Sequence, residues 1–390
     1  MKWPAKRMQS QQGKGFGVYE RAASLEAGGA DVIHLEVGRP SFDTPQHIKD
    51  ATKKALDEGI VHYGDLAGDS ELREHLAAKL KADNGIPAEP GDIVVTTGLT
   101  QAAMAVFEAG LDPGDEVVML EPFYPQHPPK IELVGGRVVG VPLVEAENWR
   151  LDADELGAAV GPKTTMICLV NPVNPVGRVL TRTELEDVAD IAIANDLVVV
   201  TDEVYEYITY DGHEHISIAS LDGMQDRTLS LFAFTKAYAM DGWRMGYAVG
   251  PPQMIADVKR ITMNQTTHPN VFAQKGAIAA VAGGRGVVDE MVAEDRRRRD
   301  LLCSRLNAIE GIECPVPEAT IYAFPNVSGL GLSSSELVTA LLERGHVAVE
   351  DGGFYGPAGD GHLRICFGSE PYERLVEAVD RIEEVVEQIR

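Results

Sequence analysis

Residues 93–122 read IVVTTGLTQAAMAVFEAGLDPGDEVVMLEP. Two short apolar runs flank a stretch with helical character, which Thr100 opens and which ends near Gly110 and Pro113. The stretch therefore predicts a strand, a helix and a second strand. It also places a helix N-terminus at the carboxyl end of the first strand.

Five further apolar runs extend this pattern toward the C-terminus. They are RVVGVPL (137–143), TTMICLV (164–170), DLVVVTDE (196–203), RTLSLFAF (227–234) and MGYAVG (245–250). Runs of this kind, separated by helical stretches, are typical of strands buried on both faces. We expect an α/β fold with a large three-layer domain around a mostly parallel, seven-stranded sheet.

The pattern changes after about residue 285. A charged helical stretch is followed by short apolar runs around IYAFPNV and HLRICFG and by a closing helical stretch, YERLVEAVDRIEEVVEQI. A chain of 390 residues is also longer than one core usually supports. We predict a large domain over 45–285 and a smaller α+β domain formed by 1–44 and 286–390.

The overall charge argues against two classes of partner. The formal net charge is −25, which disfavours nucleic acid and anionic membranes. The basic run Arg296–Arg299 is interpreted as a solvated helix face. No apolar run is long enough for a membrane helix, and the first residues lack the apolar centre of a signal peptide, so a cytoplasmic location is expected.

Cysteine and histidine spacing indicates no metal site. The four cysteines, Cys168, Cys303, Cys314 and Cys366, form no CxxC pair and are expected to be buried thiols. His213 and His215 have spacing typical of metal ligands but no convincing further ligands, and are interpreted as loop residues.

Lys236 lies between an apolar run and a glycine-containing turn, in FAFTKAYAMDGWRMGYAVG (232–250). A lysine amine attacks a carbonyl only when it is neutral, so a catalytic lysine needs a desolvated or electropositive site. Arg244 is a candidate for such a positive neighbour and for a phosphate ligand. Taken alone, the segment leaves open that Lys236 and Arg244 are ordinary loop cations.

The apolar strand in DLVVVTDEVYEY ends with Asp202 and is followed by Tyr205. Carboxylates at this end of a parallel strand lie where α/β proteins bind ligands. A nucleotide site with a magnesium-binding carboxylate is disfavoured, because the chain has no GxxxxGK[ST] loop. An acid beside a cationic ring, a metal ligand or a helix cap remain as interpretations of Asp202.

Two more loops follow predicted strands. LVNPVNPVGRVL (169–180) contains Asn174 in a rigid, proline-rich loop, for which a purely structural role is a fair alternative. Gly98, Leu99 and Thr100 lead into the first predicted helix, where free N–H groups and the helix dipole favour an anion. Capping alone would also account for Thr100.

Three motifs occur together in one order and spacing. VNPVNPVG (170–177) resembles NPxNPTG, DEVYEYITYDG (202–212) resembles DExYxxxxYxG, and TKAYAMDGWRMGY (235–247) resembles SKxxxMxGWRxGY. The chain from about residue 32 onward is thus similar to the class I/II aminotransferases, which are fold-type I pyridoxal-phosphate enzymes related to aspartate aminotransferase. This resemblance implies the α/β fold with a smaller domain, and pyridoxal 5′-phosphate as cofactor.

The resemblance also implies the catalytic roles. Lys236 would hold the cofactor as a Schiff base and shuttle the proton between the substrate Cα and the cofactor. Asp202 would pair with the pyridine nitrogen, so that the ring withdraws electrons. Asn174 and Tyr205 would bind the phenolic oxygen, and Tyr124, in EPFYPQH, would stack on the ring. Core packing is the alternative for Tyr124.

The implied phosphate site combines one chain with its partner. Gly98, Leu99, Thr100 and Arg244 would hold the phosphate, together with Tyr63 from a second subunit. The resemblance therefore implies a homodimer with shared active sites.

The resemblance implies that residues of both domains bind the substrate. Arg364, in GDGHLRICFG, would bind the α-carboxylate, a task suited to a planar bidentate donor. Asn174 would also contact the substrate, and Gly38 would let the N-terminal segment approach it. A structural ion pair is the alternative for Arg364.

Several positions depart from the family pattern. Ala233 stands where a phosphate-binding serine is frequent, and Val176 where the motif has threonine. Ile321 replaces an aromatic residue, which suggests a different side-chain pocket. Some relatives that use aspartate carry a lysine at the position of Thr100, and Arg39 is a candidate for another distal cation.

The expected activity is transfer of an α-amino group from an L-amino acid to a 2-oxo acid by a ping-pong mechanism. A β- or γ-lyase, or another reaction at the α-carbon, remains open because the same residues activate any bound amino acid. A non-catalytic pyridoxal-phosphate-binding sensor, such as the effector domain of a transcription regulator, is disfavoured because no helix-turn-helix segment precedes the fold.

Overall fold

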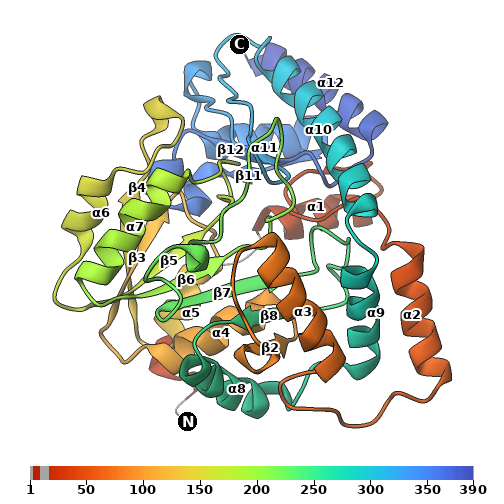
Figure 1. Cartoon of the computed structure of the whole chain (residues 1–390). Helices are drawn as coiled ribbons and strands as arrows, with labels where there is room; N and C mark the ends of the chain where they lie inside the picture. Colours follow the sequence, from red (N-terminus) through yellow and green to blue (C-terminus); the bar gives the residue numbers. More distant parts are fainter. Residues whose placement is uncertain (1–2, 9–16, 390) are drawn as a thin grey trace.

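The computed structural model describes residues 3–8 and 17–389. A seven-stranded sheet lies at its centre (Figure 1). Its strands in chain order are β2 (Ile93–Thr96), β3 (Glu116–Glu121), β4 (Arg137–Pro142), β5 (Thr164–Val170), β6 (Val198–Asp202), β7 (Thr228–Ala233) and β8 (Gly246–Val249). The spatial order is β2-β8-β7-β6-β5-β3-β4, and only β8 runs antiparallel to its neighbours. The prediction of a mostly parallel seven-stranded sheet is confirmed.

Helices cover both faces of this sheet. One face packs on α4 (Leu99–Gly110), α5 (His127–Leu133) and α8 (Pro252–Thr266). The other packs on α3 (Ser70–Asp83), α6 (Ala153–Ala159), α7 (Arg182–Ala194) and α9 (Val271–Ala282). Alternate residues along β2 divide between the faces, with Val94 on the first and Ile93 and Val95 on the second. This alternation explains why the inner strands are apolar on both faces, because neither of their faces meets water.

The helix in the opening stretch begins two residues earlier than we predicted. Its N-cap is Gly98, not Thr100, and Gly98 has φ of 78°. Glycine adopts this backbone conformation without strain, so the chain turns sharply from β2 into α4. Thr100 consequently lies in the first turn of α4, beside the sheet edge where β5 and β6 also end.

A second group of elements lies at the top of Figure 1. It contains a parallel pair, β1 (Ile33–His34) with β10 (Val347–Ala348), and an antiparallel sheet of β11 (Glu350–Asp351), β12 (Leu363–Cys366) and β9 (Tyr322–Ala323). Helices α10 (Gly286–Leu306), α11 (Ser334–Gly345) and α12 (Tyr372–Ile389) pack against these strands, as does α1 (Gly17–Ala27). The remaining helix, α2 (Gln46–Asp57), packs on α9.

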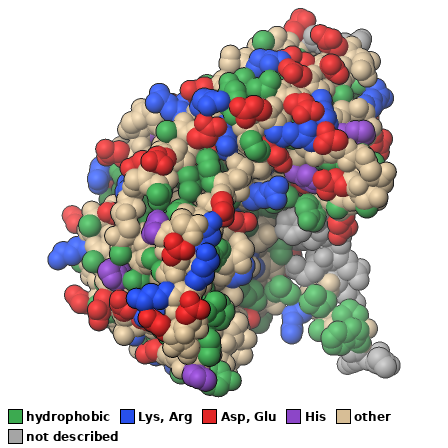
Figure 2. Space-filling model, turned by 90° about the vertical axis from the view of Figure 1, so that its right-hand side faces the viewer, with side chains coloured by type: hydrophobic (Ala, Val, Ile, Leu, Met, Phe, Trp, Pro, Cys, Tyr) green, Lys and Arg blue, Asp and Glu red, His purple; other side chains and the backbone are tan. Residues whose placement is uncertain are grey.

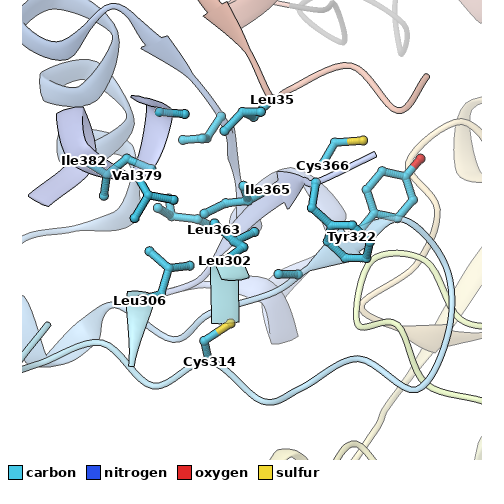
Figure 3. Packing of buried hydrophobic residues seen from close by; sticks show 14 of the residues in the cluster. Leu35, Leu302, Leu306, Cys314, Tyr322, Leu363, Ile365, Cys366, Val379 and Ile382 are labelled. Carbon is cyan, nitrogen blue, oxygen red and sulfur yellow. The ribbon is translucent and has the colours of Figure 1, made fainter. Parts of the chain in front are cut away.

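The core of this second group is apolar and continuous. Leu35, Leu302, Ile365 and Val379 come from four separate segments and are buried together (Figure 3). Tyr322 lies at the edge of this cluster, with its hydroxyl pointing away from the labelled aliphatic side chains. Packing in this cluster thus fixes the backbone of β9 and β12, while the Tyr322 hydroxyl faces out of the cluster.

The division into domains stays a proposal. All strands of the large sheet fall between residues 93 and 249, and the small sheets use residues 33–34 and 322–366. This distribution supports a large domain over 45–285 and a smaller one formed by 1–44 and 286–390. Residues 1–2, 9–16 and 390 of the proposed smaller domain lie outside the described residues.

The interpretation of Arg296–Arg299 as a solvated face is wrong for two of its members. Arg298 and Arg299 are buried, with exposed fractions of 4% and 3%. Arg298 bonds to Ser41 at 2.8 Å, and Arg299 pairs with Asp211 at 2.7 Å. The run of four consecutive charged residues did not indicate that two of them are buried. Consecutive residues of a helix point in different directions, so only some of them face solvent.

The visible surface is mixed in charge. In Figure 2, acidic and basic side chains are interspersed over the face shown. No helix in the described part of the chain is long and apolar enough to cross a membrane. The four cysteines are buried free thiols.

Candidate active site

A cavity of about 370 Å³ lies where the carboxyl ends of β5 and β6 meet the smaller sheets. Its lining joins residues that are far apart in the sequence, from the loop after β1 to β12. Of the site residues predicted from the sequence, it is lined by Gly38, Leu99, Thr100, Tyr124, Asn174, Asp202, Tyr205, Lys236, Arg244 and Arg364. The fold therefore brings ten predicted residues to one cavity.

Lys236 follows β7 by three residues and points into this cavity. Its Nζ donates a hydrogen bond to the Gly38 carbonyl and lies 5.9 Å from the centre of the Tyr205 ring. No carboxylate of the described residues forms an ion pair with it. The amine is thus held by a single neutral acceptor that a ligand can replace.

Gly38 allows a close approach that no other residue would permit. A Cβ atom at this position would lie 1.9 Å from the Tyr322 hydroxyl oxygen. The Tyr322 ring is buried and therefore has little room to move. Glycine is required here by space, because its backbone passes directly over the ring.

Asp202 is the last residue of β6 and is 3% exposed. Its Oδ1 accepts the Val204 N–H at 3.2 Å, and its Oδ2 lies 3.2 Å from Nε2 of His127. Burial lowers the pKa of His127, although the Asp202 hydrogen bond opposes this effect. We infer that a neutral imidazole orients the Asp202 carboxylate.

Sequence reasoning missed His127, although it lies in the quoted segment EPFYPQH. It is the first residue of α5, three positions after Tyr124, and the two rings meet edge to face at 5.1 Å. The sequence feature that could have identified His127 is its position about one helical turn after Tyr124, which was predicted to stack on the cofactor ring.

Tyr124 and Tyr205 have buried hydroxyls whose raised pKa values keep them protonated at neutral pH. The Tyr205 hydroxyl lies 2.7 Å from that of Tyr322, and burial raises the pKa of Tyr205 well above its usual value. Burial raises the pKa of Tyr124 in the same direction. Both phenols are therefore available as hydrogen-bond donors to an oxygen anion.

The start of α4 forms a cradle with Arg244. Leu99 and Thr100 line the cavity, and a Cβ on Gly98 would lie 2.6 Å from Nη2 of Arg244. Arg244 has φ of 54° and donates to the Asp241 carbonyl at 2.7 Å. A helix N-terminus with an adjacent guanidinium suits a phosphate. Gly98 itself does not line the cavity; it makes room for the arginine.

Thr235 supplies a hydroxyl that the sequence comparison with the family motif left unassigned. It lines the cavity directly before Lys236, whereas Ala233 does not line it. Thr235 thus places a hydroxyl next to Lys236, although Ala233 lacks the hydroxyl of the serine that is frequent at its position.

Arg364 lies on β12 and is 7% exposed. Its Nη2 donates to the Glu36 carbonyl, and its Nε has no partner. The guanidinium carbon lies 4.4 Å from the centre of the Tyr322 ring and 5.1 Å from that of Tyr355. No carboxylate of the described residues pairs with it, so its charge is available to an incoming anion.

The donor set fits pyridoxal 5′-phosphate. Asn174 Oδ1 and Arg364 Nε are buried polar atoms without partners at this cavity, and a bound polar molecule would satisfy them. The cradle at α4 suits the phosphate, Asp202 suits a ring nitrogen and Lys236 suits an aldehyde. These residues together match the chemistry of the whole cofactor.

Tyr63 is not brought to this cavity. Its side chain is 91% exposed, and its ring lies 5.5 Å from that of His268. The role expected for it requires a second subunit, so it stays a prediction.

Further charged residues that were not foreseen line the cavity, among them Lys130 and Glu350. Burial lowers the pKa of Lys130 to about 8, and its Nζ donates to the Gln126 carbonyl at 2.8 Å. Glu350 lies on β11 beside Arg364 and is 7% exposed. Neither belongs to a recognisable motif, so only the fold reveals them.

The loop histidines have structural contacts. His215 Nε2 lies 2.7 Å from the buried Glu203 carboxylate. His213 lies 3.8 Å from Glu318. Within residues 3–8 and 17–389, no group of acidic, histidine and cysteine side chains is arranged to hold a metal ion.

Comparison with known proteins gives concordant results. Residues 30–382 match the family described as “Aminotransferase class I and II”. The chain is 42% identical over 367 residues to an “Aspartate aminotransferase” of Pyrococcus abyssi, covering 93% of this chain and 94% of the relative. It is 40% identical over 367 residues to “Aromatic-amino-acid aminotransferase 2” of Thermococcus litoralis, with the same coverage.

Solved structures agree with these relatives. An aromatic aminotransferase from Pyrococcus horikoshii superposes with a TM-score of 0.89 at 41% identity, covering 95% of this chain and 99% of that chain. A Thermus thermophilus aspartate aminotransferase with maleate superposes with a TM-score of 0.93 at 34% identity, covering 99% and 100%.

Proposed function

The chain belongs to the class I and II aminotransferases, and from this premise we propose a specific role for each residue of the cavity. The protein is a pyridoxal-phosphate-dependent aminotransferase. When bound, pyridoxal phosphate supplies an aldehyde that accepts the amino group and a ring that withdraws electrons from the substrate Cα. The observation that carries the assignment of roles is the convergence of Lys236, Asp202 and Arg364 on one cavity.

Lys236 is the residue that holds the cofactor and moves a proton at the substrate Cα. Among the described residues, its amine donates one hydrogen bond, to the Gly38 carbonyl, which leaves the amine able to exchange partners. Asp202 holds a proton at the ring nitrogen, and His127 fixes the carboxylate for that task. Because Asp202 is buried, its charge acts in a medium of low dielectric constant, where a proton on the nitrogen is strongly favoured.

The remaining residues bind and orient. Asn174 and Tyr205 bind the phenolic oxygen, and Tyr124 packs on the ring. The phosphate is bound by the cradle of Gly98, Leu99, Thr100 and Arg244. Arg364 binds the α-carboxylate of an L-amino acid, and then that of the 2-oxo acid, through its free N–H groups. Asn174 and Gly38 border this position.

A half-reaction experiment tests the proposed transfer. The protein loaded with cofactor is mixed with one L-amino acid and no oxo acid, and the products are counted. We expect one equivalent of oxo acid per site and no ammonia, followed by amino transfer when a second 2-oxo acid is added. Release of ammonia would instead indicate the eliminating lyase.

We propose a preference for aromatic side chains. Rings border much of the cavity, including Tyr19 and Phe354 near solvent and Tyr355 deeper inside. Stacked rings favour an aromatic substrate. Arg39 also lines the cavity and is exposed, and its positive charge favours a dicarboxylate as the second candidate. Glu370 lies 3.8 Å from Arg39. Comparing kcat/KM for phenylalanine and aspartate, in the wild type and in Arg39→Gln, separates the two candidates.

The protein is further proposed to act as a homodimer in the cytoplasm. Val61 and Tyr63 are exposed hydrophobic side chains that a second subunit would cover. Four buried thiols without a disulfide agree with a reducing compartment. Size-exclusion chromatography with light scattering tests the dimer.

A further inference from the structure

Glu350 and Arg364 are direct cross-strand neighbours. Their Cα atoms pair in the antiparallel ladder between β11 and β12, and both residues line the cavity. Opposite residues in such a ladder direct their side chains to the same face. A carboxyl group therefore stands beside the arginine to which we assign the substrate carboxylate.

Glu350 is the carboxylate at this position that lacks a partner. Glu36 lies 2.7 Å from His34 Nδ1, and Asp351 accepts hydrogen bonds from Ser334 at 2.7 Å and from a backbone N–H at 3.1 Å. The Glu350 carboxylate, by contrast, makes no hydrogen bond or ion pair with any residue that the structure describes. A buried carboxyl without a partner is costly when charged.

We propose that Glu350 is a positioning residue that couples binding of a carboxylate at Arg364 to the uptake of one proton. The inference rests on the proposed role of Arg364. When the anion binds, a proton from water is added to the Glu350 carboxylate; when the anion leaves, that proton returns to water. The net charge of the cavity is then the same before and after binding.

The electrostatics of the neighbouring groups support this coupling. Burial raises the pKa of Glu350 to about 7, Arg364 on β12 lowers it, and Glu36 and Asp351 raise it. Tyr355, from the turn that follows β11, also faces this cavity, and burial raises the pKa of its phenol well above the usual value, so it stays neutral. A second anion on Arg364 opposes the charged form of Glu350 further, because like charges repel.

The direction of the pH effect follows. Below the free-state pKa of Glu350 the carboxyl is already neutral, and a carboxylate binds Arg364 without cost. Between the free-state pKa and the higher pKa of the bound state, binding adds protons to Glu350, so affinity falls as pH rises. A further rise of about one pKa unit on binding corresponds to a roughly tenfold loss of affinity across this range.

A calorimetric titration measures the coupling. The holoenzyme is titrated with 3-phenylpropanoate, which has no amino group and stays ionised from about pH 6 to about pH 9. Titrations in two buffers with different heats of ionisation count the protons taken up. The visible absorbance band of the lysine-bound cofactor is recorded in the same samples, so that protons taken up there can be subtracted.

Variants assign the remaining protons. In Glu350→Gln we expect uptake near neutral pH to fall by about half a proton, the largest uptake that a shift of about one pKa unit produces, and affinity to lose its roughly tenfold dependence on pH. Glu350→Asp should restore part of both. Asp295→Asn is the matched control, because burial also raises the pKa of this carboxyl to about 7 but it does not line the cavity, and proton uptake and affinity should match the wild type.

The possible outcomes separate the two claims. Equal uptake and equal pH dependence in wild type and Glu350→Gln would overturn the role of Glu350, while leaving Arg364 as the carboxylate site. Unchanged affinity for 3-phenylpropanoate in Arg364→Leu would instead refute the assignment of Arg364, on which the inference rests.

Discussion

Replacing Gly38 with alanine tests how closely the segment around Gly38 packs against Tyr322. The new methyl group would meet the Tyr322 hydroxyl oxygen at 1.9 Å and the ring carbon that carries it at 2.8 Å. Tyr322 is 2% exposed and its hydroxyl is hydrogen-bonded to that of Tyr205, so the Tyr322 side chain has little room to move away. We expect a loss of stability of about 1–3 kcal/mol, the range for overpacking a core.

A double-variant cycle identifies the cause of that loss. Tyr322→Phe removes the closest oxygen at a cost of about 1 kcal/mol for the bond to Tyr205. If the clash is with the hydroxyl, Gly38→Ala combined with Tyr322→Phe should be more stable than the sum of the single effects, by at least about 0.5 kcal/mol. Urea unfolding at one pH measures all four proteins.

Two results would refute this reasoning. Gly38→Ala with wild-type stability would show that the segment moves aside without cost. Strict additivity in the cycle would show that the methyl group meets something other than the Tyr322 hydroxyl.

Further predictions concern Asp202, Glu350 and Tyr63. Asp202→Asn should lower kcat at least about 100-fold, as expected when about 3 kcal/mol of transition-state stabilisation is lost, while the protein still binds cofactor in an equilibrium dialysis assay. Glu350→Gln should gain stability relative to wild type as pH rises from about 4.5 to about 7, by up to about 3 kcal/mol in urea unfolding, because the folded-state pKa of Glu350 is raised and its deprotonation costs stability in that window. Mixing inactive Tyr63→Ala with inactive Lys236→Ala should restore activity, because a hybrid dimer contains one site with both residues intact.

Each of these expectations has a clear contrary result. Unchanged kcat in Asp202→Asn would remove the carboxylate from the chemistry. A stability difference in Glu350→Gln that is the same at pH 5 and pH 8 would show that the carboxyl titrates normally. Failure of the Tyr63 and Lys236 mixture to regain activity, with hybrids demonstrated by mass spectrometry, would exclude sharing of Tyr63.

The large sheet was predictable because its signal is local. Each strand from Ile93 to Val249 is a short apolar run, and the helices between them bury both faces. The smaller elements were less clear, since β9 and β11 have only two residues each and are defined by their partners. Arg298 and Arg299 show the same limit, because their burial depends on Ser41 and Asp211, which are remote in the sequence.

The residues of the candidate site also differ in whether the local sequence reveals them. Lys236, Asp202 and Asn174 were predicted because they lie in motifs with fixed spacing. His127 and Glu350 were not, because their contacts with Asp202 and Arg364 exist only once distant strands and helices pack together. The pKa of Glu350 likewise arises from burial by the fold, which no local pattern of residues encodes.

The central claim is that Lys236 binds the cofactor and moves the proton at the substrate Cα. The most direct measurement is the absorbance spectrum between about 300 and about 500 nm of purified protein loaded with pyridoxal phosphate, before and after addition of L-amino acids, with Lys236→Ala alongside. The account predicts a visible band in the wild type that amino acids convert to the spectrum of the aminated cofactor, and no such conversion at a comparable rate in Lys236→Ala. Equally fast conversion in both proteins, or no cofactor band in the wild type after loading, would contradict it.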